Sequence, residues 1–135
     1  MKNKPDLIYF PKAGSREIGY ISIAELSHLL PFDIKRVFWT YHTPTNVIRG
    51  KHAHKETEIV LIAAVGKVEV TTEDAKGNKE IFVLDDPSIG LYLPPSIWHT
   101  MIYSDGALQI ALASTSYTES DYLRSKEDFL EYWAS

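Results

Sequence analysis

Short β-type runs separated by turn residues recur along the chain from residue 34 onward, and this constrains the fold more than any other feature. The runs read IKRVFWTYH, TEIVLIAAV, KVEVTTE, KEIFVLD, GLYLP and ALQIALAS. Closely spaced strands of this kind predict an antiparallel sandwich or barrel. Residues 67–71 alternate polar and apolar as a half-exposed strand does, whereas residues 59–65 are apolar at both parities, which predicts a strand covered on both faces. We therefore expect an all-β fold.

Two segments carry the signals that begin a helix. In residues 22–30 and in residues 125–133 a serine, Ser22 or Ser125, stands three positions before an acidic residue, and apolar residues follow at helical spacing. This arrangement is typical of a capping box. We expect one short helix in each segment.

Composition excludes several classes of protein. Fourteen Lys and Arg against eighteen Asp and Glu give a formal net charge of -4, so the chain lacks the positive field that holds nucleic acid or anionic lipid. The absence of cysteine excludes disulfides, thiolate zinc sites and thiol catalysis. No signal-peptide core and no run of roughly 20 apolar residues is found. We expect one cytoplasmic domain over residues 1–135, without nucleic-acid or membrane partners.

The segment RGKHAHKETE, residues 49–58, is the most informative for chemistry. Alternate residues of an extended strand face the same way, so His52 and His54 project from one face roughly 6.6 Å apart. Arg49 points the other way unless a bulge at Gly50 re-aims it. The segment could be a solvated strand end, but two imidazoles and three cations within seven residues are costly to gather unless an anion or a carbonyl binds there. We interpret it as a site.

A third histidine follows in GLYLPPSIWH, residues 90–99. Taken alone, a Trp98–His99 pair is more often packing than chemistry. In an antiparallel barrel, however, residues distant in sequence meet in the interior, and barrel mouths are common ligand sites. We therefore interpret His99 together with the first histidine pair.

The pattern His-x-His, then Glu, then a distant His resembles the cupin superfamily. Its members here would be His52, His54, Glu58 and His99. This resemblance alone implies a metal-dependent enzyme in which three imidazoles and a carboxylate bind Fe, Mn, Zn or Ni. We keep that function as an alternative.

Three longer motifs, RGKHAHK, GLYLPPSIWH and ALASTSYTESDYLR, stand in order across residues 36–132. Together they are similar to the sugar 3,4-ketoisomerases that act on dTDP-4-keto-6-deoxyglucose. The resemblance implies a cupin-type jelly roll, a homodimer, a dTDP-linked 4-keto-6-deoxy sugar substrate, and catalysis without a metal or other cofactor. It also implies a place in the biosynthesis of dTDP-linked deoxyamino sugars for surface polysaccharides, such as the O-antigen of lipopolysaccharide, or for glycoproteins.

The same resemblance assigns residues. It places His52 and His54 in the active site, and it makes Tyr41 the candidate for a tyrosine that the family takes from the preceding strand. Candidate substrate-binding residues are Arg49, Lys51 and Lys55 for the diphosphate, Trp98 for stacking, and His99. Lys51 and Lys55 could equally be surface charges, and Trp98 could be packing. The tail residues Tyr117, Asp121 and Arg124 either close the site or lie at a dimer contact.

The expected chemistry suits these side chains. Moving a carbonyl from C4 to C3 requires removal of the C3 proton, an enediol or enediolate, and return of a proton at C4, with no redox cofactor. Histidine, whose ordinary pKa is near 6.5, is largely unprotonated at neutral pH and serves as the base. We hypothesise that one histidine of the pair takes the C3 proton while the other, with Tyr41 or Arg49, steadies the oxygens at C3 and C4.

Two further alternatives remain. A 3,5-epimerase acting on the same sugar nucleotide also needs a histidine base, but it would exchange solvent hydrogen at C5. A non-catalytic cupin would bind the sugar nucleotide and leave it unchanged, using the same groups as hydrogen-bond partners.

Overall fold

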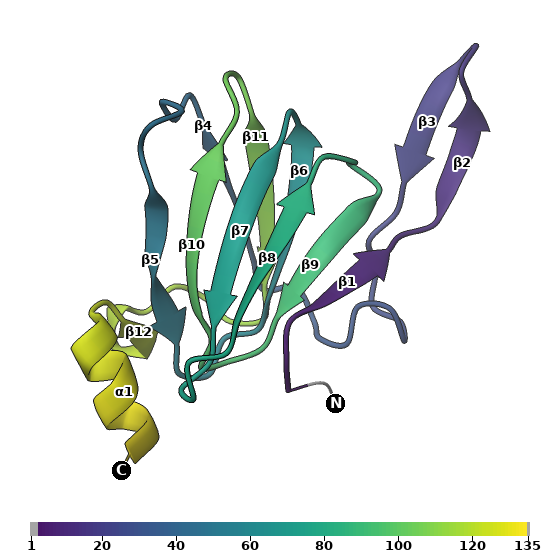
Figure 1. Cartoon of the computed structure of the whole chain (residues 1–135). Coiled ribbons are helices and arrows are strands. Elements are labelled where there is room, and N and C mark those ends of the chain that lie inside the picture. Colours follow the sequence, from purple (N-terminus) through teal and green to yellow (C-terminus); the bar gives the residue numbers. More distant parts are fainter. Residues whose placement is uncertain (1–2, 135) are drawn as a thin grey trace.

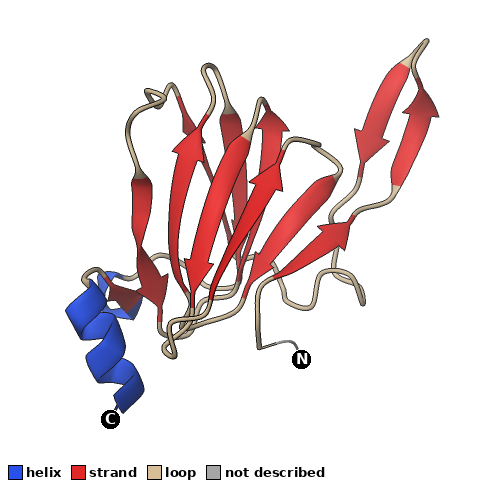
Figure 2. Ribbon diagram, viewed as in Figure 1, coloured by secondary structure: helices blue, strands red, loops and turns tan. Residues whose placement is uncertain are grey.

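The computed structural model describes residues 3–134, and its main body is a pair of facing antiparallel sheets (Figure 1, Figure 2). One sheet has the strand order β1-β9-β6-β11-β4 and the other β12-β5-β10-β7-β8, while β2 and β3 form a separate hairpin. The strands are β1 (Asp6–Tyr9), β2 (Lys12–Ser15), β3 (Gly19–Ser22), β4 (Arg36–Tyr41), β5 (Arg49–His54), β6 (Ile59–Val65), β7 (Val68–Glu73), β8 (Lys79–Leu84), β9 (Ile89–Leu93), β10 (Trp98–Tyr103), β11 (Leu108–Ala113) and β12 (Tyr122–Leu123). The helical elements are a 3-10 turn, η1 (Glu119–Asp121), and one helix, α1 (Lys126–Ala134).

From β4 onward the chain passes repeatedly between the two sheets. Strands β4, β6, β9 and β11 belong to one sheet, and β5, β7, β8, β10 and β12 belong to the other. Apart from the β7–β8 hairpin, neighbouring strands of the two sheets are therefore distant in sequence, as in a jelly roll. The prediction of an all-β, cupin-type jelly roll is confirmed. Within residues 3–134, no helix is long and apolar enough to cross a membrane.

Strand β6 is covered on both faces, as its unbroken apolar run predicts. Leu61 points between the sheets into the main core, whereas Val60 points outward. There the N-terminal segment covers it with Phe10 and Phe32. The outer cover explains why this strand shows no polar alternation.

Helix α1 covers the outer face of the second sheet. Phe129 is fully buried against Ala53 of β5 and Leu123 of β12. The helix is capped by the Ser125 side chain, whose Oγ accepts a hydrogen bond from the Asp128 N–H at 3.0 Å. The helix expected over residues 125–133 is therefore confirmed.

The helix expected over residues 22–30 is wrong. Ser22 is the last residue of β3, where it pairs with Lys12, so its backbone is used in a hairpin. The following segment forms bends, and Leu30 is fully buried in the outer apolar cluster. Tertiary packing thus overrides the local capping signal.

A β-bulge interrupts the pairing of β5 with β10. His99 pairs with His52 and Thr100 pairs with Gly50, which leaves Lys51 as an extra residue. Gly50 and Lys51 both adopt positive φ, 84° and 59°. One inserted residue exchanges the two faces of a strand, so Arg49 lies on the same face as His52. The bulge that the sequence allowed at Gly50 is present.

Alanine at Gly50 is expected to destabilise the protein more than alanine at Gly77. Both glycines have positive φ, 84° and 88°. A Cβ at Gly50 would also lie 2.9 Å from the His99 carbonyl oxygen, whereas a Cβ at Gly77 would meet nothing within 4 Å. Gly50→Ala should lower the free energy of unfolding by roughly 1–2 kcal/mol more than Gly77→Ala, as measured by urea denaturation. Equal losses would contradict the close approach at the bulge.

Candidate active site

Four aromatic rings lie together on the inner face of the second sheet. His52 of β5 pairs with His99 of β10, and His54 of β5 pairs with Tyr122 of β12. Cross-strand partners share a face, and His52 and His54 alternate along one strand, so all four side chains point the same way. The ring centroids of His52 and His99 are 4.7 Å apart, those of His52 and His54 5.1 Å, and those of His54 and Tyr122 4.4 Å. The structure thus brings the three predicted histidines together.

Each of the three imidazoles is held through its Nδ1 atom. His52 Nδ1 lies 3.0 Å from the Gly50 carbonyl oxygen, and His99 Nδ1 lies 3.2 Å from the Ile97 carbonyl oxygen. His54 Nδ1 lies 3.0 Å from Asp121 Oδ2. Carbonyl and carboxylate oxygens only accept, so each Nδ1 carries the proton and each neutral ring keeps its lone pair on Nε2. The His54 Nε2 is buried and has no protein partner among the described residues.

Asp121 anchors His54. Its Oδ1 accepts the Glu56 N–H at 2.8 Å, and its Oδ2 also accepts the Thr57 hydroxyl. Asp121 is 8% exposed. Burial alone would raise the pKa of this carboxyl, but the hydrogen bonds from Thr57, Glu56 and His54 outweigh burial and hold the pKa below its usual value. Asp121 is therefore a carboxylate at neutral pH, and it favours positive charge on His54.

Burial keeps the imidazoles uncharged. Desolvation, followed by the neighbouring His54, lowers the pKa of His52 to about 4. Desolvation also lowers the pKa of His54, against the opposing effect of Asp121, and it lowers the pKa of His99 well below 6.5. At neutral pH all three rings are neutral, which is the state a general base needs.

Strand alternation places the other predicted site residues on different faces of the sheet. Arg49 faces inward through the bulge, and Lys51 is exposed within it. Lys55 follows His54 and points the other way, with its Nζ 5.8 Å from the Tyr132 ring on α1. Trp98 precedes His99 and packs on the outer face against Phe129 at 5.9 Å. The structure therefore does not bring Lys55 or Trp98 to the histidines.

Tyr41 also lies away from the histidine cluster. It is 57% exposed on the outer face of β4, and its ring meets His42 at 5.0 Å. The less exposed residues of β4 are those that alternate with the face of Tyr41, namely Arg36, Phe38 and Thr40. The phenol beside the histidines is that of Tyr122, which sequence reasoning missed although it lies in the tail motif SYTESDYLR.

The tail residues surround Tyr122. The Tyr117 ring lies 5.6 Å from the Tyr122 ring, and the Arg124 guanidinium lies 4.1 Å above it. Arg124 binds Glu119 through two nitrogens, at 2.6 and 2.9 Å. The structure therefore places this segment beside the histidines.

Glu58 does not join the imidazoles. Its Oε1 accepts the Tyr92 hydroxyl at 2.7 Å, and Tyr92 belongs to the apolar cluster outside the first sheet. Across residues 3–134, no group of three or more His, Cys, Asp or Glu side chains is arranged to hold a metal ion. The four ligands that the cupin resemblance implies are therefore not gathered at one point.

His52 should make stability depend on pH. In the unfolded chain its pKa is about 6.5, and in the folded protein it is about 4. Between these values the unfolded state binds the extra proton, so the free energy of unfolding falls as pH falls, by about 1.4 kcal/mol per pH unit for one such group. Above pH 6.5 this contribution to stability is fully present.

His52→Asn removes this titration, so urea denaturation across pH 4–7 should show a shallower loss of stability. The control is His28→Asn, because His28 is exposed and should keep the parent slope. Identical slopes for the His52 variant and the parent would contradict the assignment.

Comparison with known proteins identifies the family. Residues 3–134 match the family model described as FdtA: WxcM-like, C-terminal. The TDP-4-oxo-6-deoxy-alpha-D-glucose-3,4-oxoisomerase of Aneurinibacillus thermoaerophilus is 38% identical over 99% of this chain and 94% of that protein.

Two solved structures extend the likeness. The 3,4-ketoisomerase QdtA of Thermoanaerobacterium thermosaccharolyticum, a variant in complex with TDP-4-keto-6-deoxyglucose, is 32% identical with a TM-score of 0.90, over 98% of this chain and 95% of that one. The WlaRB TDP-quinovose 3,4-ketoisomerase of Campylobacter jejuni is 35% identical with a TM-score of 0.88, over 97% of this chain and 99% of that one. The chain therefore belongs to the FdtA family of sugar 3,4-ketoisomerases, which its three motifs resemble.

Proposed function

We propose that this protein is a sugar-nucleotide 3,4-ketoisomerase that converts dTDP-4-keto-6-deoxy-D-glucose to a dTDP-3-keto-6-deoxyhexose. The observation that carries the proposal is the pair His52 and His54, whose neutral rings share one face with their Nδ1 atoms fixed. Relatives that share nearly the whole chain are named as 3,4-isomerases of such sugars, and one was solved with TDP-4-keto-6-deoxyglucose.

The pair is suited to moving a proton between adjacent carbons. An Nε2 lone pair takes the proton from C3, and a protonated ring returns one at C4. His54 holds the resulting positive charge more easily than His52, because the Asp121 carboxylate lies 3.0 Å from its Nδ1. The Tyr122 hydroxyl, beside both rings, takes the role first given to Tyr41 and donates a hydrogen bond to a sugar oxygen.

The nucleotide end of the substrate requires cations. We assign the diphosphate to Arg49, which the bulge turns inward and which stays exposed, with Lys51 beside it. A guanidinium pairs two phosphate oxygens at once. His99 lies behind His52 and holds it in place through ring contact at 4.7 Å.

The product fits a biosynthetic role for the protein in the cytoplasm. A ketone at C3 is the electrophile that an amine donor needs, so an aminotransferase would act next and give a dTDP-linked deoxyamino sugar. Such sugars would serve surface polysaccharides, including the O-antigen of lipopolysaccharide.

The proposal predicts that His52→Asn and His54→Asn each lower ketosugar turnover by 100-fold or more, since general acid–base catalysis typically contributes that much. Turnover of dTDP-4-keto-6-deoxyglucose is followed by NMR in deuterium oxide. Deuterium should enter at C3 of the substrate and at C4 of the product. Deuterium at C5 would indicate a 3,5-epimerase, and binding without exchange would indicate a non-catalytic cupin.

Matched variants control this experiment. Tyr122→Phe should slow turnover, whereas Tyr41→Phe, on the exposed outer face of β4, should leave it unchanged. The enzyme should keep full activity after dialysis against a chelator. Loss of activity that returns with a divalent metal would favour the metal-dependent alternative.

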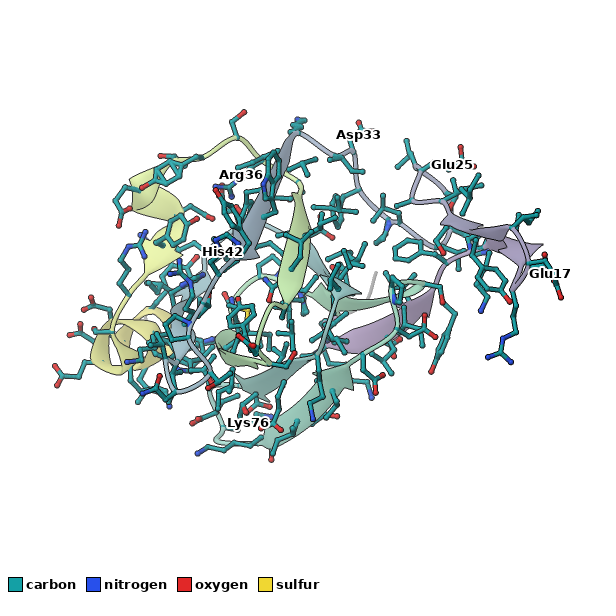
Figure 3. The ribbon with its side chains drawn as sticks, turned by 90° about the horizontal axis from the view of Figure 1, so that it is seen from above. Glu17, Glu25, Asp33, Arg36, His42 and Lys76 are labelled. Atoms are coloured by element: carbon teal, nitrogen blue, oxygen red, sulfur yellow. The ribbon has the colours of Figure 1, made fainter. Side chains whose placement is uncertain are left out.

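We further propose that the protein is a homodimer. The β2–β3 hairpin stands away from the two sheets (Figure 1), and Glu17 marks its tip at one end of the molecule (Figure 3). An isolated two-stranded hairpin is marginally stable in water, yet this one exposes Ile18 at 84% together with Tyr20 and Ile21.

The outer face of edge strand β4 exposes Val37, Trp39 and Tyr41. A second copy covers both surfaces.

Sedimentation should therefore give about twice the 15.3 kDa mass of the chain. Trp39→Glu introduces a charge on a side chain that is 60% exposed and should shift the protein to monomer. Ile81→Glu, on β8, changes a residue that is 64% exposed outside these surfaces and should leave the dimer intact. A monomeric parent, or dissociation by the Ile81 variant alone, would overturn this interface.

A further inference from the structure

Arg36 is an inward-facing cation that neither the motifs nor the family assignment singled out. It is the first residue of β4, and it pairs with the fully buried Ala113 of β11. Its guanidinium carbon lies 5.3 Å from the Phe38 ring and 5.7 Å from the Tyr117 ring. Figure 3 shows it where β4 faces the C-terminal segment. Its Nη1 donates to the Tyr122 hydroxyl at 3.4 Å.

Among the residues that the structure describes, this guanidinium has no anionic partner. In the described part of the chain the ion pairs are His54–Asp121, Lys79–Glu73, Arg124–Glu119 and Lys126–Glu73, and none includes Arg36. Its Nε is buried without a hydrogen-bond partner. A buried polar group without a partner is costly, and a partly buried charge without a counterion more so. An anion from outside the described residues would complete the arrangement.

The position of Arg36 identifies that anion. Burial is the main cause that lowers the pKa of His54, and the charge of Arg36 adds to it. Tyr122 lies between them, 4.4 Å from the His54 ring and hydrogen-bonded to Arg36. A ketosugar ring develops negative charge only when it loses its C3 proton. The exposed Arg49, in the bulge of β5, is the cation for the diphosphate.

We propose that Arg36, together with the Tyr122 hydroxyl, binds the C4 carbonyl oxygen of the ketosugar and stabilises the enediolate; this rests on the ketoisomerase function proposed above. When an imidazole takes the C3 proton, the C3–H electron pair becomes the C3=C4 bond and the carbonyl π pair moves to the C4 oxygen. The guanidinium hydrogen-bonds that oxygen in a low-dielectric site. Transfer of the O3 proton to the C4 oxygen and return of a proton at C4 then give the C3 ketone and a C4 hydroxyl, without an oxidant.

The test distinguishes a role of Arg36 in stabilising the oxyanion from a role in binding the diphosphate. Arg36→Met, Arg36→Lys and the control Lys35→Met are assayed for kcat and KM, for C3 exchange in deuterium oxide, and for dTDP affinity by calorimetry. Lys35 is the exposed neighbouring cation. Arg36→Met should lower kcat and C3 exchange by about 100-fold or more, because one oxyanion donor is typically worth that much. Its dTDP affinity should stay within threefold of the parent, which also shows that the variant folds.

Arg36→Lys, which keeps the charge without the fork of donors, should fall between Arg36→Met and the parent. A large loss of dTDP affinity in a folded Arg36→Lys protein would overturn the proposal in favour of diphosphate binding. Unchanged kcat and C3 exchange would overturn it as well. A parent enzyme that binds dTDP but never converts the ketosugar would instead refute the proposed function.

Discussion

The register of β5 between β10 and β12 is the constraint on which the site depends. His52 pairs with His99 and His54 pairs with Tyr122, while the residue between the two histidines, Ala53, lies beneath helix α1. A slip of one residue would bury both imidazoles under the helix and expose Ala53 to the inner face. The bulge at Gly50 lets the same strand keep this register and still turn Arg49 inward.

Once the rings share that face, their environment determines their chemistry. Three imidazoles within 6.3 Å of one another would repel strongly if charged, and burial already disfavours the charged form. The Nδ1 atoms of His52 and His99 are bound by carbonyl oxygens, which supply no full charge. Of the three rings, His54 alone is hydrogen-bonded to a carboxylate among the described residues, that of Asp121. The cluster is therefore neutral at rest, and a transferred proton is most stable on His54.

Local pattern in the sequence was sufficient to predict strands β4 to β9 and β11 and the shared face of His52 and His54, because alternation acts over two residues. It did not predict β1, β2, β3, β10 or β12. The roles of Asp121 and Tyr122 depend on pairing across the fold, since Asp121 is 67 positions from His54. The direction of Tyr41 was equally hidden: in RVFWTY the wholly apolar set, Val37, Trp39 and Tyr41, is the exposed one, and the less exposed positions alternate with it. Residues 22–30 carry a valid capping signal but form no helix, because Ser22 pairs with Lys12 in the hairpin.

Alternation along β4 also connects the proposed dimer with the proposed role of Arg36. Residues 37, 39 and 41 form the exposed apolar outer face, and Arg36 and Phe38 point inward from the same backbone. β4 is an edge strand, held on one side only by β11. Edge strands have fewer restraints than central ones, and a catalytic group must be held within a fraction of an ångström. A second copy that covers the outer face would therefore also fix the guanidinium against Tyr122.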